Sequence, residues 1–167
     1  MASIIHSFDP ADNELRSKNL ATVVQYMLLR GQERLTRAKF FVPGSEATAG
    51  NGYGVGCEER YMTGIEAIRK ADEFNAKTWP DWGFDDIQIY ETGDPNFFWV
   101  DSTGSGLSKL PGHEPRHYGG RYLHTFVMRD GLILHYREWR NPCVEYITFG
   151  YEMPSLLVSR EDLEQGN

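Results

Sequence analysis

Polar and apolar residues alternate on both sides of Asp130-Gly131, within residues 121–141. This dipeptide favours a two-residue hairpin turn, in which both central residues need a positive φ. Pairing outward from such a turn places Leu123 opposite Glu138. Side chains of a strand point alternately to opposite faces, so Glu138 would share its face with mostly apolar neighbours. A buried carboxylate destabilises the fold unless something compensates its charge. Glu138 is therefore the first candidate functional residue.

The spacing of apolar residues predicts three helical regions. A long amphipathic helix is expected over residues 9–30, opening with an N-cap and a first-turn proline at Asp9-Pro10. Residues 31–41 are typical of a second, shorter helix or of a turn. A capping box predicts a further helix over residues 63–78.

The other strands are predicted from shorter alternating runs. Residues 84–92 and 97–102 form a second hairpin that is rich in aromatic side chains. Residues 44–60 are dense in glycine, but their spacing fits neither a dinucleotide loop nor a Walker loop. A hairpin that turns around Asn51-Gly52 is the better interpretation of this segment.

Helices followed by a run of antiparallel strands predict an α+β fold. A strongly curved antiparallel sheet, wrapped around the N-terminal helices, would form a cone that holds Glu138 on its concave face. Both faces of the 121–141 hairpin are too apolar to meet water, so we expect a homodimer through the sheet. The 167 residues contain no repeat or linker and are expected to form a single domain. Residues 1–9 and 160–167 are expected to be flexible ends.

Composition narrows the classes of function. The formal net charge of −7 argues against a nucleic-acid partner held by a basic face. No apolar run approaches membrane-spanning length, and the first residues lack the layout of a signal peptide. Cys57 and Cys143 lie far apart in the sequence and form no CxxC motif. We expect them to be reduced thiols in a cytoplasmic protein.

Several polar and aromatic residues are candidates for a ligand site, each with a structural alternative. Asn75 shares a helix face with apolar neighbours, either as a satisfied core amide or as a pocket hydrogen-bonder. Tyr118 lies in an irregular segment, where functional residues often occur. Glu138 is as readily the structural partner of Arg121 or Arg140 as a catalytic group. The histidines do not predict a metal site, since HEPRH at 113–117 contains a proline and the strand histidines are expected to point away from Glu138. His124 and His135 are those strand histidines.

A family resemblance emerges from motifs in consistent order along residues 12–142. They are PDW at 80–82, ETGDPNFFWVD at 91–101, LPG at 110–112, the frame YxHxF…DGxIxxxREWxNP at 122–142, and the helical segment 15–37. Together they resemble the phenazine-biosynthesis A/B family, which belongs to the NTF2-like, ketosteroid isomerase-like superfamily. The resemblance implies a small dimeric enzyme without a metal or an organic cofactor. Members of the family promote the condensation of two aminocyclohexenone-carboxylate molecules into a tricyclic phenazine precursor.

Carried over by position, the resemblance implies roles for particular residues. Glu138 falls on the family's acid/base carboxylate, and Arg37 on an arginine suited to a substrate carboxylate. Ala71 departs from the family, because better-endowed members have a histidine there. The expected site is catalytic Glu138 and Tyr118 with substrate-binding Arg37, Asn75, Trp79 and Trp82, the two tryptophans being otherwise simple core residues.

One carboxyl that is neutral part of the time could carry out both proton transfers of this condensation. Joining an amine to a ketone needs a proton delivered to the departing oxygen and a proton removed from nitrogen, and burial raises a carboxyl pKa toward the useful range. The expected ligand is a cyclic amino-ketone carboxylate or a phenazine-like molecule. Two alternatives remain open. One is an isomerase, dehydratase or cyclase of the same fold that acts on another cyclic ketone. The other is a weakly catalytic or non-catalytic ligand-binding paralogue, which could form a heterodimer with a more active copy. Ala71 is the feature that keeps this second alternative open.

Overall fold

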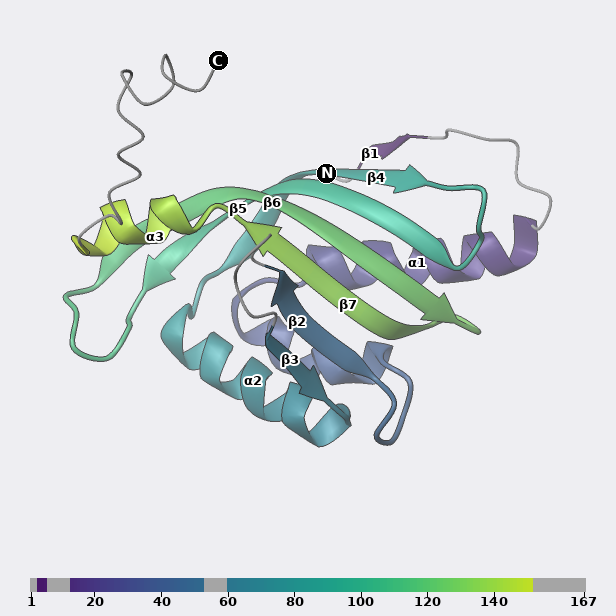
Figure 1. Cartoon of the computed structure of the whole chain (residues 1–167), viewed down its shortest axis with the longest axis horizontal. Coiled ribbons are helices and arrows are strands. Elements are labelled where there is room, and N and C mark those ends of the chain that lie inside the picture. The colour runs from purple at the N-terminus through teal and green to yellow at the C-terminus, as the bar shows by residue number, and fades with distance from the viewer. Residues whose placement is uncertain (1–2, 6–12, 53–59, 152–167) are drawn as a thin grey trace, which may run out of the picture.

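One mixed seven-stranded sheet dominates the computed structural model, which describes residues 3–5, 13–52 and 60–151 (Figure 1). The strand order is β1-β4-β5-β6-β7-β2-β3. The strands are β1 (Ser3–Ile5), β2 (Thr48–Gly52), β3 (Arg60–Thr63), β4 (Gly83–Glu91), β5 (Phe97–Ser108), β6 (Arg116–Arg129) and β7 (Leu132–Arg140).

The sheet arches over three helices, with a fourth after its last strand (Figure 1). The three are α1 (Asn13–Leu28), the 3₁₀ helix η1 (Gly31–Phe40) and α2 (Ile65–Thr78); the fourth is α3 (Pro142–Phe149). The core fills the space between the sheet and these helices, with fully buried Phe98, Phe126 and Met27 among its largest side chains. The predicted α+β class and curved sheet are confirmed.

The sheet is mainly antiparallel, as expected, but it also contains two parallel pairs that the sequence did not predict. β1 pairs with β4, and β2 with β7, in parallel. Ser3–Ile5 thus form a strand within a terminus that we expected to be flexible, whereas residues 160–167 lie outside the described part of the chain.

Two further predictions from local sequence signals, a hairpin turn at Asn51-Gly52 and a helix cap at Thr63, differ from the structure. Asn51-Gly52 belongs to β2, and any turn before β3 falls on residues 53–59, outside the described residues. α2 begins after Gly64 at φ 85°, without the side-chain cap predicted at Thr63. Asp9-Pro10 lies outside the described residues.

The predicted turn of the β6–β7 hairpin is confirmed, but the predicted pairing is wrong. Asp130 (φ 53°) and Gly131 (φ 86°) both adopt the positive φ of a primed turn. Leu134 then has no partner in β6, because the pairing steps from Met128–Ile133 to Val127–His135. Such a bulge shifts the register by one residue.

The shifted register changes which side chains share a face. Glu138 pairs with His124, and Leu123 pairs with Trp139. His124 therefore lies on the concave face beside Glu138, contrary to the prediction that it points away. Leu123 lies on the outer face, where its exposed fraction is 40%.

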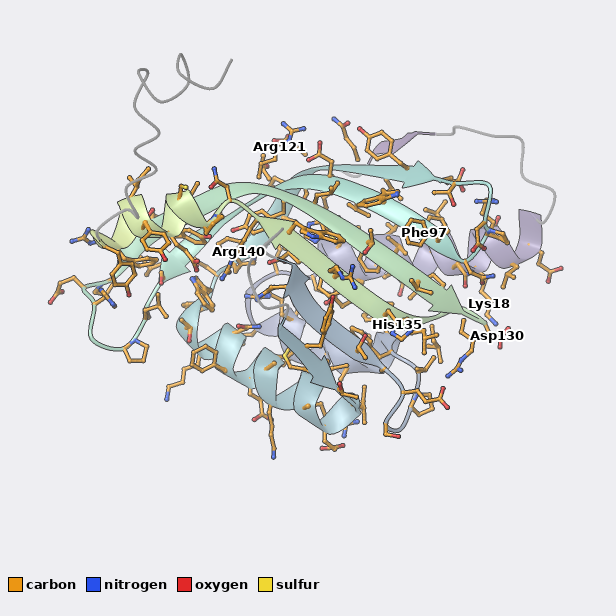
Figure 2. The ribbon with its side chains drawn as sticks, in the orientation of Figure 1. Lys18, Phe97, Arg121, Asp130, His135 and Arg140 are labelled. Carbon is orange, nitrogen blue, oxygen red and sulfur yellow. The ribbon has the colours of Figure 1, made fainter. Side chains whose placement is uncertain are left out.

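Polar side chains of α1 hold both hairpin turns against the helix. The buried Asn19 side chain accepts a hydrogen bond from Gly131 N (2.8 Å) and donates to Pro95 O (2.9 Å) and Asn96 Oδ1 (3.0 Å). Figure 2 shows Lys18 of α1 and Asp130 of the β6–β7 turn at the same end of the molecule. α1 thereby links the β4–β5 and β6–β7 turns at this end of the molecule.

The described helices include none that is long and apolar enough to cross a membrane.

Asn19→Ala is expected to lower the free energy of unfolding by about 2–4 kcal/mol, because it strands the buried Gly131 N–H and removes the donor to the β4–β5 turn. Urea denaturation measures the change. Gln25→Ala, at an exposed position of the same helix, is the control and should stay within about 0.5 kcal/mol of the wild type. Equal stability of the two variants would contradict this role.

Candidate functional site

A cavity of about 340 Å³ opens between the concave face of the sheet and the helices η1 and α2. This volume lies toward the small end of the range of about 300–1,000 Å³ that is usual for small-molecule pockets. All of the residues predicted for a site line it: Glu138, Tyr118, Arg37, Asn75, Trp79 and Trp82. The structure thus brings together residues from η1, α2, β6, β7 and the segment after α2. Their catalytic and binding roles remain predictions.

Glu138 projects from β7 into this cavity with 16% of its side chain exposed. Burial raises its pKa above the ordinary value, while the charge of Arg140 and a hydrogen bond from Tyr136 Oη (3.0 Å) act in the opposite direction. Of the two arginines considered as structural partners, Arg121 binds Asp101. Arg140, whose charge acts on Glu138, also lies with its Nη2 3.2 Å from Glu145 Oε1.

A line of buried hydrogen bonds runs behind Glu138. His124 Nδ1 lies 2.9 Å from Tyr136 Oη, and His124 Nε2 lies 2.9 Å from Ser102 Oγ. Burial, assisted by the charge of Arg37, lowers the pKa of His124 to about 3, so the ring is neutral at pH 7. The approach of 3.8 Å between His124 and Glu138 is therefore not an ion pair.

The directions of these hydrogen bonds follow from Tyr136 donating to Glu138. The Tyr136 oxygen then accepts from His124 Nδ1–H, and His124 Nε2 accepts from the Ser102 hydroxyl. Every donor points toward Glu138, which stabilises its carboxylate form and fixes its position.

Two buried arginines of η1 give the cavity a cationic wall. Arg37 is 5% exposed, and its Cζ lies 4.6 Å from the centroid of the Tyr26 ring. Its Nε and Nη2 have no hydrogen-bond partner among the described residues. Arg34 donates through Nη1 to Trp79 O (3.2 Å), and burial with the neighbouring Arg37 lowers its pKa to about 10. Both side chains are charged at pH 7 and suit an anionic ligand group.

Aromatic rings form a further part of the cavity wall. Trp82 and Tyr118 stack with ring centroids 5.6 Å apart and an interplanar angle of 26°. Tyr118 lies in β6 rather than in the predicted irregular segment, and it accepts a hydrogen bond from Tyr122 Oη (3.2 Å). Burial raises the pKa of Tyr118, so its hydroxyl keeps its proton. The buried Trp79 Nε1 has no partner within the described chain. Flat faces with two N–H or O–H groups suit a ring that carries polar substituents.

Sequence analysis missed Asp72. This residue of α2 lines the cavity with only 7% of its surface exposed. Burial raises its pKa to about 6, although Arg37 and Arg34 act to lower it. The signal was present, because Asp72 lies four residues after Ile68 and three before Asn75, on the helix face that we assigned to Asn75 and its apolar neighbours. Ala71 also lines the cavity, next to Asp72.

The sequence of this chain matches a known protein family over nearly its whole length. The family model described as phenazine biosynthesis protein A/B matches residues 2–163. This chain belongs to that family. The resemblance predicted from the motifs is thereby confirmed.

Individual members of the phenazine biosynthesis A/B family are similar to this chain over most of their length. The chain is 36% identical over 143 residues to phenazine biosynthesis protein PhzA2 of Pseudomonas aeruginosa, covering 86% of this chain and 87% of that protein. It is 37% identical over 132 residues to PhzB1 of the same species, covering 77% and 78% of the two chains.

Solved structures confirm the NTF2-like fold. The crystal structure of a phenazine biosynthesis-related protein (phzb2) from P. aeruginosa superposes with a TM-score of 0.83 at 33% identity, covering 93% of each chain. An NTF2-like protein from Anabaena variabilis superposes with a TM-score of 0.53 at 13% identity over 77% of this chain and 87% of that one. The second likeness shows the fold alone.

Asp72→Asn is expected to stabilise the protein at pH 7. The carboxyl has a pKa of about 6 in the folded state and an ordinary pKa of 3.8 in the unfolded state, so its contribution to stability is lost as pH rises between these values. Removing the charge should recover up to about 3 kcal/mol at pH 7 and almost nothing at pH 4. Urea denaturation of both proteins at the two pH values measures this difference. A variant less stable than the wild type at pH 7 would contradict the raised pKa of Asp72.

Proposed function

We propose that this protein promotes the acid/base-assisted condensation of two aminocyclohexenone-carboxylate molecules into a tricyclic phenazine precursor. Glu138 is the acid/base group, Tyr118 a hydrogen-bonding partner in the cavity, and Arg37 the partner of a substrate carboxylate. Asn75 hydrogen-bonds the substrate, while Trp79 and Trp82 contact its rings. No metal or organic cofactor takes part in this proposal.

One observation carries the proposal: a carboxyl with a raised pKa faces buried cations across an aromatic-lined cavity. The arginine N–H groups without partners in the described chain suit a carboxylate, and the stacked pair Trp82–Tyr118 suits a flat ring. Membership of the phenazine biosynthesis A/B family supports the choice of reaction.

The raised pKa lets Glu138 act in both directions. In its neutral form it protonates the carbonyl oxygen that departs as water, and in its ionised form it takes a proton from nitrogen. General acid/base assistance of this kind typically contributes about 10²–10⁴-fold. Holding two reactants in line can contribute more, since effective molarities reach about 10⁵ M and above.

Because of Ala71, we expect positioning of the reactants to contribute more to the rate than acid/base assistance does. Where the family resemblance implies an imidazole, the cavity wall carries only a methyl group. We expect orientation of the two substrates to supply an unusually large share of the rate.

A second candidate is an isomerase, dehydratase or cyclase that acts on a single cyclic ketone. The cavity volume near the lower end of the small-molecule range favours it, because one ring needs less space than two. Mass spectrometry of the products from the aminocyclohexenone precursor separates the candidates: a tricyclic product supports condensation, and its absence favours the single-ring reaction.

Glu138→Gln is expected to lower the single-turnover rate of condensation by about 10²-fold, the lower end of the acid/base range, because positioning remains intact. Ala71→His is expected to raise the rate, since the added imidazole places a further proton-transfer group in the cavity wall. Stopped-flow absorbance with the precursor in single-turnover conditions measures both changes.

Glu66→Gln is the matched control, since Glu66 is an exposed acid of α2 outside the cavity. Its rate should remain within about twofold of the wild type. An unchanged rate in Glu138→Gln would remove the acid/base role.

We further propose that the protein is a homodimer through the outer face of the sheet. Phe97, Trp99 and Trp139 are only partly buried there, and the rings of Trp99 and Trp139 lie 5.8 Å apart. Figure 2 shows Phe97 and His135 on this part of the sheet. Aromatic side chains and arginine are enriched in protein interfaces, and Arg137 lies 5.4 Å from the Trp139 ring centroid. A paralogue with a similar face would form a heterodimer by the same contacts.

Trp139→Glu is expected to convert the dimer into a monomer, because it places a carboxylate at the centre of the apolar face. Sedimentation velocity at micromolar protein measures the change. Gln25→Glu on the exposed side of α1 should leave the dimer intact. A wild-type protein that sediments as a monomer would overturn this assembly.

A further inference from the structure

Asp72 has no structural partner that accounts for its burial. It is 7% exposed, and its Oδ2 lacks a hydrogen-bond partner among the described residues. The described residues form no ion pair with it, although the charges of Arg34 and Arg37 reach it. A buried carboxyl oxygen without a partner destabilises the folded state. An acid maintained under these conditions is typical of a group that meets a ligand.

The helix geometry directs Asp72 into the cavity. Ile68, Ala71, Asp72 and Asn75 occupy one face of α2, and all four line the cavity. Glu138 lines the same cavity from β7, on the sheet. Two carboxyls therefore enter the cavity from different layers of the fold.

Asp72 and Arg37 offer complementary contacts from neighbouring helices. Arg37 presents Nε and Nη2 without a partner in the described chain, and Asp72 presents an acceptor oxygen. The arginine suits a carboxylate, whereas the acid suits an amine or ammonium group. This pair of contacts matches a ligand that carries both groups on one small ring.

We infer that Asp72 is a second catalytic carboxyl, which contacts the substrate amine while Glu138 serves the carbonyl oxygen. The assignment rests on the proposed condensation and deepens it, because it gives the addition step a separate carboxyl for the amine and for the carbonyl oxygen. It also explains how a chain with Ala71 in the cavity wall keeps an acid/base group on α2.

The two carboxyls complete a balanced cycle. Glu138 starts protonated and Asp72 ionised. As the amine nitrogen bonds to the carbonyl carbon, one N–H proton passes to Asp72 and the oxygen takes the proton of Glu138. When the C–O bond breaks, the hydroxyl takes the proton of Asp72 and leaves as water, while the remaining N–H proton passes to Glu138. The products are an imine and water, both carboxyls regain their starting states, and no electrons are transferred.

The electrostatic setting of Asp72 agrees with this assignment. The ionisable groups that face it are Arg34 and Arg37 of η1, Tyr26 of α1 and Glu138 of β7. With its pKa at about 6, Asp72 exchanges a proton in the range where an imidazole would.

A binding experiment tests recognition of the amine without requiring catalysis. Calorimetry compares cyclohexanecarboxylate with 3-aminocyclohexanecarboxylate at pH 7. The wild type is expected to bind the amino compound about tenfold more tightly, and to lose this preference below pH 5 as Asp72 takes up a proton. Asp72→Asn should bind the two compounds equally at both pH values, while Glu73→Gln, an exposed acid beside Asp72 on α2, should keep the preference. A preference retained in Asp72→Asn would overturn the assignment.

Single-turnover kinetics with the aminocyclohexenone precursor test the proton transfer. Asp72→Asn is expected to react about 10²-fold more slowly than the wild type at saturating precursor, and Glu73→Gln to react at the wild-type rate. An unchanged rate in Asp72→Asn overturns the proton-transfer step. A wild-type protein that shows the Asp72-dependent preference but makes no tricyclic product would overturn the condensation and leave the amine contact standing. Circular dichroism of each variant shows that it is folded.

Discussion

The bulge at Leu134 determines which side chains of the β6–β7 hairpin enter the cavity. Strand side chains alternate between faces, so one unpaired residue changes every pairing beyond it. With this register, Glu138 pairs with His124 and shares the concave face with Tyr136. Without the bulge, Leu123 would lie opposite Glu138, and the hydrogen bonds through Tyr136 and His124 would not form. The position and protonation of the acid both depend on this local irregularity.

The cavity combines one wall whose polar groups are satisfied with another whose groups are not. Behind Glu138, Ser102, His124 and Tyr136 form a closed line of hydrogen bonds that orients the carboxyl. On η1 and α2, the polar atoms of Arg37 and Asp72 lack partners in the described chain. The first wall gives rigidity and the second gives affinity for a ligand, at a cost in stability that is common at functional sites. This division explains why charge and aromatic surface coexist inside a small α+β fold.

Some local signals in the sequence were reliable, and the central turn is the clearest of them. Asp130-Gly131 forms the predicted turn because few other residues adopt two successive positive φ angles. The register beyond the turn was wrong because a bulge depends on packing against the helices, which the pattern of a hairpin does not contain. Asp72 was missed because a helical position reveals only a face, and the burial of an acid on that face depends on what packs against it. Glu138, Asn75 and Tyr118 were first singled out from local patterns, and the family resemblance supplied their predicted roles. Most of the six predicted site residues lie too far apart in sequence for spacing to relate them.

The sequence by itself determined α1, η1, α2, most strands, the central turn and the family, since these depend on periodicity, turn chemistry and ordered motifs, but it did not predict α3. Only the tertiary structure decided that β1 and β2 join the sheet in parallel, that His124 faces Glu138, and that Asp72 is buried beside two arginines. The physical reason is that burial, register and electrostatic environment are properties of segments brought together from distant parts of the chain. A carboxyl acquires its acid/base character from those neighbours and not from its place in the sequence.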